Sequence, residues 1–145
     1  MGWFNIYGMI FIIVIMIPNI IFAIKCKDGF NNKFTNKIIE TIEQVGRYGC
    51  FALMMINIPY TYYGWWFNHA DLVYLIIDSF LVIIYCIIWI ICWNKNNVFK
   101  ALSLSIIPSL IFLFSGIMLC SILLIIFSII FSISHIIISY INAIL

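Results

Sequence analysis

Acidic and aromatic residues recur at helical spacing within one hydrophobic stretch of the chain. Asp71, Asp78 and Tyr85 are separated by intervals of seven, and Tyr74 follows Asp71 by three, so all four share one helix face. Asn57, in the preceding stretch, is expected at a depth comparable to that of Asp78. Such a face predicts either a pocket that binds a cation or passes protons through Asp78, or a structural Asp78 that ties its segment to the preceding one.

A second polar stripe lies near the C-terminus and is accompanied by a seam of small residues in the preceding segment. The stripe is Ser121, Ser128, Ser132, His135 and Ser139, which stay within about 40° of one helical line, and the seam is Ser105, Ser109 and Gly116. Small residues at this spacing favour close helix packing, with hydroxyls bonding across the contact. The alternative is proton handling by His135 together with Asn19, at a similar depth.

The familiar catalytic and metal-binding motifs are absent from the sequence. There is no GxSxG, HExxH or phosphate-binding glycine loop, and the five cysteines form no CxxC pair and no cluster with His69 or His135. We therefore expect no metal site and no cofactor. These absences make the enzyme class less favoured but do not exclude it.

The composition indicates that these side chains are positioned by helices inside a membrane. Only 8% of the 145 residues are charged and 66% are hydrophobic, whereas soluble domains carry about 25% charged residues. The lipid bilayer is therefore the expected environment. The net charge of +2 is too small to indicate a nucleic-acid partner.

The hydropathy pattern predicts an all-α fold, a polytopic transmembrane helix bundle that forms a single domain over residues 1–145. The expected spans are 3–24, 48–63, 72–93, 98–119 and 121–142. An amphipathic helix at 36–47, capped by Thr35 or Asn36, is expected to lie at the membrane surface before the second span. An aromatic run at 60–67 is typical of a membrane interface.

The region after Lys100 contains no charged residue, and it can be divided in two ways. As one helix, residues 98–145 would reach about 70 Å, more than twice the thickness of the hydrocarbon layer. Two spans with a turn marked by Ser115, Gly116 and Ser121 fit better. A four-span bundle with one re-entrant segment is the alternative.

The basic residues predict the orientation. All seven, which are Lys25, Lys27, Lys33, Lys37, Arg47, Lys95 and Lys100, fall in or beside the loops after the first and third spans. Because lysine and arginine concentrate in cytoplasmic loops, we expect the N-terminus outside and the C-terminus in the cytoplasm.

Several short stretches resemble a group of small multispanning membrane proteins of low-GC Gram-positive bacteria. They are Ile17-Pro18-Asn19, Lys25-Cys26-Lys27-Asp28-Gly29-Phe30, Glu43-Gln44-Val45-Gly46-Arg47-Tyr48-Gly49-Cys50, and the region from Ile107-Pro108 to His135. The resemblance implies a bacterial plasma membrane and carries no activity with it.

Three functional classes remain at this point. The first is a binding or accessory subunit, with a homo-oligomer or a membrane partner held through the small-residue seams. The second is a proton-coupled transporter of a cationic or amphipathic solute that uses Asp78. The third is a membrane-embedded enzyme using His135 and Asp78, and it is the least favoured because these residues are expected in opposite halves of the bilayer.

Overall fold

The computed structural model describes residues 3–25, 36–95 and 97–144, which form five helices and no strands. The helices are α1 (Ile6–Lys25), α2 (Lys37–Met55), α3 (Ala70–Ile91), α4 (Val98–Leu119) and α5 (Ile122–Ile144). The prediction of an all-α fold is confirmed. Among the described residues, four helices are long and apolar enough to cross a membrane: α1, α3, α4 and α5. Lys27 and Lys33 of the predicted basic loop, and the alternative cap Thr35, lie outside the described residues.

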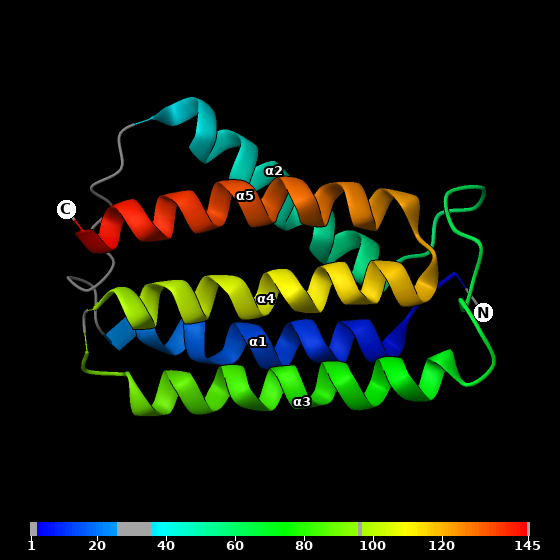
Figure 1. The fold of residues 1–145 in the computed structure, drawn as a ribbon, viewed down its shortest axis with the longest axis horizontal. Coiled ribbons are helices and arrows are strands. Elements are labelled where there is room, and N and C mark those ends of the chain that lie inside the picture. The colour runs from blue at the N-terminus through cyan, green and yellow to red at the C-terminus, as the bar shows by residue number, and fades with distance from the viewer. Residues whose placement is uncertain (1–2, 26–35, 96, 145) are drawn as a thin grey trace.

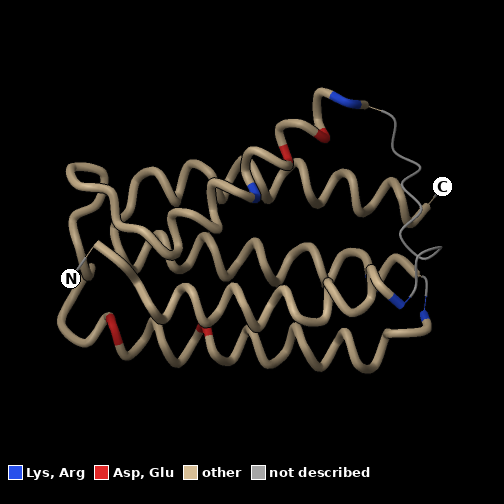
Figure 2. The backbone as a smooth tube through the Cα atoms, turned by 180° about the vertical axis from the view of Figure 1, so that it is seen from behind, with Lys and Arg blue, Asp and Glu red and all other residues tan. Residues whose placement is uncertain are grey.

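The helices run back and forth along the long axis of the bundle (Figure 1). α4 packs between α3 and α5, α1 packs against α2 and α3, and α2 crosses α5 obliquely. The N-terminus and the C-terminus lie at opposite ends. Most of the basic positions gather in the half of the bundle that holds the C-terminus (Figure 2).

Residues predicted as a surface helix and a following span form one helix, α2. Its N-cap is Asn36, whose side chain accepts hydrogen bonds from the N–H groups of Ile38 and Ile39. The helix ends at Met55, whereas the predicted span continued to residue 63. The reason is that Ile56 is extended and pairs with Phe4, so the backbone leaves the helix three residues before Pro59.

The aromatic segment after α2 is held against the turn between α4 and α5. The N–H of Tyr63 donates to the carbonyl of Cys120 at 3.2 Å, and that of Trp66 donates to Met118 at 2.9 Å. The turn consists of Cys120, which is left-handed with φ 50°, and Ser121. Ser115 and Gly116 lie within α4, and α4 and α5 are two separate antiparallel helices.

The residues of α2 that are exposed and those that are buried differ from the prediction of a helix at the membrane surface. Apolar residues of the segment predicted as a surface helix, 36–47, are on the outside of the bundle, with Ile38 73% and Val45 55% exposed. The opposite face, which includes Glu43 and Gly46, is buried against α5. The first half of α2 therefore buries Glu43 and exposes apolar side chains together with the polar residues Lys37, Thr41 and Gln44, whereas its second half buries Cys50, Leu53 and Met54.

Candidate functional site

A large cavity occupies the half of the bundle nearest the C-terminus. Its volume is about 1250 Å³, and all five helices contribute to its wall. The wall is polar along the first half of α2, and on α4 and α5 it combines apolar residues with Lys100, Ser105, His135, Ser139 and Asn142. Asn19, His135 and Tyr85, which the sequence analysis singled out, all line it.

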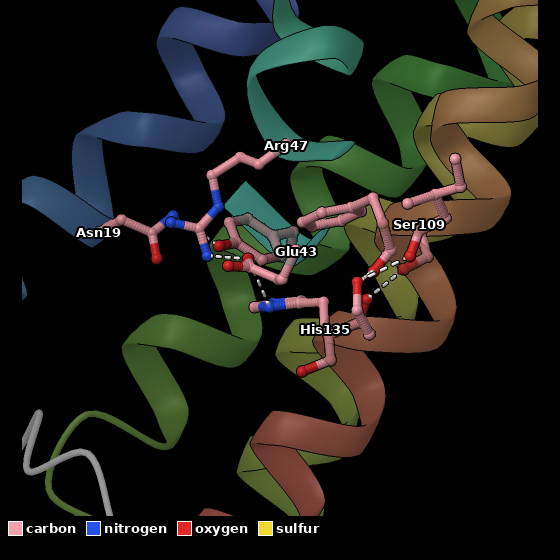
Figure 3. A network of polar contacts seen from close by, with 10 residues as sticks. Asn19, Glu43, Arg47, Ser109 and His135 are labelled. Atoms are coloured by element: carbon pink, nitrogen blue, oxygen red, sulfur yellow. Dashed lines mark hydrogen bonds and ion pairs between the residues drawn. The ribbon is translucent and has the colours of Figure 1, made fainter. Parts of the chain in front are cut away.

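The polar centre of the cavity is a cluster of three ionisable side chains, Glu43, Arg47 and His135 (Figure 3). Arg47 donates to the Oε1 atom of Glu43 within α2, and the Nδ1 atom of His135 on α5 lies 3.2 Å from the same oxygen. Arg47 and His135 thus both contact one oxygen of the carboxylate. The carboxylate side chain is 5% exposed, whereas Arg47 and His135 are 32% and 21% exposed. Glu43 is therefore the buried anchor, and its two partners face the cavity.

Two glycines bring the helices of this cluster together. A Cβ atom at Gly46 would lie 2.9 Å from the backbone nitrogen of Phe131, and one at Gly49 would lie 2.5 Å from the ring of Phe127. Their absence lets α2 approach α5 closely, as small residues do in membrane helix pairs. The His135 ring is stacked on Phe131 with a centroid distance of 4.7 Å, which fixes the imidazole beside the carboxylate.

Further polar groups of the cavity wall come from α1, α3 and α4. The side-chain amide of Asn19 donates to the hydroxyl of Tyr85 at 2.6 Å and so links α1 to α3. The ammonium group of Lys100 lies 4.4 Å from the ring centroid of Phe22 and 5.1 Å from that of Trp89, distances at which cation–π attraction operates.

Asp78 is fully buried and lines neither of the two cavities described here. The hydroxyl of Ser115 on α4 donates to its Oδ2 atom at 2.5 Å. The structural alternative expected a link to the preceding segment, and this detail is wrong because the bond joins α3 to α4. Tyr74 shares the buried face, and its hydroxyl accepts a hydrogen bond of 3.2 Å from Asn5.

The predicted outward pocket contains only some of the predicted residues. A cavity of about 260 Å³ at the N-terminal end is lined by Asp71 and Asn57, together with Asn5 and Trp65. Asn57 lies in the loop after α2, because that helix ends at Met55. It therefore does not share the depth of Asp78 within a helix, and the single pocket containing both carboxylates is not formed.

The serine seams pack as predicted only in part. Ser105, Ser109 and Ser128 are buried, and a Cβ atom at Gly116 would lie 2.9 Å from Ile125 across the contact between α4 and α5. The hydroxyls were expected to bond across this contact. Instead, those with a hydrogen bond donate to carbonyls of their own helix: Ser105 to Ala101, Ser109 to Ser105, Ser128 to Ile125 and Ser132 to Ser128. Ser121 accepts from the N–H of Leu124, and Ser139 lines the large cavity.

The sequence places residues 36–47 in a helix at the membrane surface, and this prediction missed the position of Glu43 and Arg47 in the cavity. A signal was present in the sequence. Gly46, Arg47 and Cys50 follow Glu43 by three, four and seven residues, so they share one helix face with it. A face that combines charges with small residues suits a close polar contact between helices better than a contact with water.

The fold and the cavity together define a helical bundle of the multi-pass membrane class, with an internal polar site. No protein-family model, curated protein or solved structure matches the chain.

Proposed function

We propose that this protein binds a lipid-like amphipathic molecule inside the bilayer, in the large cavity, and acts as a binding or accessory subunit. The observation that carries the proposal is the cavity of about 1250 Å³, with a polar centre in an otherwise apolar bundle. Pockets for drug-sized ligands measure about 300–1,000 Å³. A larger cavity whose wall combines apolar side chains with polar ones, the ionisable cluster among them, suits an amphipathic molecule with an apolar tail and a compact head group.

The environment of α2 supports placing the cavity within the membrane. Ile38, Ile42 and Val45 are exposed on its outer face, and their exposure is favourable only if that face meets lipid rather than water. We therefore propose that α2 forms a fifth crossing. The N-terminus is then outside and the C-terminus in the cytoplasm of a bacterial plasma membrane, with the cavity in the cytoplasmic half.

The geometry favours a binding role over the two alternatives. A coupling carboxylate needs access to the transported solute, and Asp78 is sealed between α3 and α4 with Ser115 as its partner. An enzyme that combines His135 with Asp78 needs both groups at one site, whereas His135 contacts Glu43 and lines the large cavity without Asp78.

The test is to fill the cavity and measure the lipid retained by the purified protein. Ala101 lines the cavity, and a phenylalanine there would occupy part of its volume. Ile106, on the same helix, is 40% exposed on the outside of the bundle, so Ile106→Phe is the matched control. Protein from nanodiscs of phosphatidylcholine and phosphatidylglycerol is released into detergent and examined by native mass spectrometry.

We expect the wild type and Ile106→Phe each to retain one bound lipid or lipid fragment. Ala101→Phe should lose it. Equal retention by the two variants would refute the assignment of the cavity as the binding site. A wild-type protein that retains no lipid would refute the proposed function itself.

A further inference from the structure

The charges around the large cavity are unequal in number. Its wall contains three permanently basic side chains, Lys37, Arg47 and Lys100, and two acidic ones, Glu40 and Glu43. One positive charge is therefore in excess when His135 is neutral. Lys37 is exposed, and Lys100 lies against the rings of Phe22 and Trp89. An anionic ligand is complementary to this basic wall and a cationic one is not.

Arg47 is placed to serve such an anion. Its guanidinium carries five N–H donors in a planar fork, and the bond to Glu43 uses only part of that set. About a third of the side chain is exposed on the cavity side. Guanidinium groups recognise carboxylate, phosphate and related oxyanions through paired hydrogen bonds.

His135 adds a proton-dependent charge at the same place. Glu43 lies between Arg47 and His135 and balances one positive charge, so protonation of the imidazole makes the three-residue cluster positive. The other ionisable side chains on the wall are Lys37 and Glu40 on α2, Tyr85 on α3 and Lys100 on α4. His135 is the wall residue whose type changes charge near neutral pH.

We propose that the cavity binds an amphipathic molecule with a monoanionic head group together with one proton, which is taken up by His135. This inference rests on the proposed function and names the chemical class of its ligand. The head group lies against Arg47, and the apolar tail lies along the wall formed by α4 and α5. Linkage makes the coupling reciprocal: the proton tightens binding of the anion, and the anion promotes protonation of His135 by the same factor.

The experiment uses three probes with the same dodecyl tail and a head group of fixed charge. They are dodecylsulfonate (anionic), dodecyltrimethylammonium (cationic) and dodecyl glucoside (neutral), titrated into the full-length protein in phosphatidylcholine nanodiscs between pH 6 and pH 8. Binding is followed by calorimetry, with empty nanodiscs subtracted. Proton uptake is followed with a pH indicator in weakly buffered solution.

We expect dodecylsulfonate to bind at least tenfold more tightly than the other two probes at pH 6. Its Kd should rise from pH 6 to pH 8, by up to about tenfold per pH unit, because one proton is linked to binding. When dodecylsulfonate binds, each protein molecule should also take up as much as one proton. Tighter binding of dodecyltrimethylammonium, or sulfonate binding without proton uptake by the wild type, would overturn the inference.

His135→Gln removes the titrating group and keeps an amide donor for Glu43, so it should bind dodecylsulfonate with little pH dependence and no proton uptake. His69→Gln is the matched control, because His69 is the only other histidine and caps α3 outside the cavity. Persistent proton uptake in a folded His135→Gln would also overturn the inference. If this variant does not fold, the proton uptake and the probe preference of the wild type decide whether the inference stands.

The outcomes separate this inference from the proposed function. Equal binding of all three probes at a site blocked by Ala101→Phe leaves the binding function in place and rejects the anion and the proton. Failure of every probe to bind the folded wild type rejects both.

Discussion

Gly46→Ala tests whether the approach of α2 to α5 forms the ionisable cluster. A Cβ atom added there would lie 2.9 Å from the backbone nitrogen of Phe131 and 3.0 Å from its Cα atom. Ordinary contacts of a Cβ atom begin near 3.4 Å. The clash is with backbone, which cannot rotate away as a side chain does, so the two helices must separate by roughly 0.5 Å.

That displacement is enough to break the link to His135. The distance between Nδ1 of His135 and Oε1 of Glu43 is 3.2 Å, and at about 3.7 Å it is no longer a hydrogen bond. Overpacking of this kind costs about 1–3 kcal/mol. At about 2–4 °C per kcal/mol for a chain of this size, Gly46→Ala should lower the Tm by roughly 2–12 °C and reduce the proton uptake that accompanies sulfonate binding.

Gly49→Ala is the control, one turn further along the same contact. The atoms that its Cβ would meet belong to the ring of Phe127, which can rotate, so we expect a smaller loss of stability and unchanged proton uptake. Both variants are compared with the wild type in one detergent by tryptophan fluorescence during heating. An unchanged Tm and normal proton uptake in Gly46→Ala would show that the helices do not depend on this contact.

Three further predictions concern other parts of the bundle. Asp78→Asn keeps an acceptor for Ser115, so its yield and Tm should be near wild type, whereas Asp78→Leu should lower the Tm; equal losses in the two variants would contradict a hydrogen-bonding role. Tyr85→Phe removes the hydroxyl that accepts from Asn19 and should cost about 1 kcal/mol in thermal unfolding, a loss that an already substituted Asn19→Leu background should not show. Reporter fusions should place the C-terminus in the cytoplasm and a cysteine-labelling site at Asn68 outside; the opposite result at both positions would reject the proposed orientation, and both positions on one side would reject three crossings by α3, α4 and α5.

The sequence was sufficient for those features that depend on length and hydropathy. Residues after Lys100 are too many for one crossing, and this predicted the separate helices α4 and α5. Asn36 was one of two predicted caps, and its side chain does accept hydrogen bonds from the first turn of α2. Such features are local, because a short stretch of chain contains all the groups that determine them.

The sequence was insufficient where the outcome depends on a partner from elsewhere in the chain. Helical periodicity divides α2 into a polar and an apolar face, but it does not say which face meets the bundle. The partner of Asp78 is Ser115, 37 residues away, and the end of α2 depends on pairing between Ile56 and Phe4. These pairings require the packed fold.

The coincidence of two destabilising features in one place connects the structure to a function. Burying Glu43 with Arg47 and His135 gives no stability that apolar residues of similar volume would not match, and the side chains that line an open cavity of about 1250 Å³ make fewer packing contacts than those of a filled core. Either feature alone has a structural explanation, such as a close helix crossing or a local packing defect. Ionisable residues inside a membrane bundle are functional candidates by default. Here they face the cavity, where an anionic head group would offset the excess positive charge and an apolar tail would restore the missing contacts.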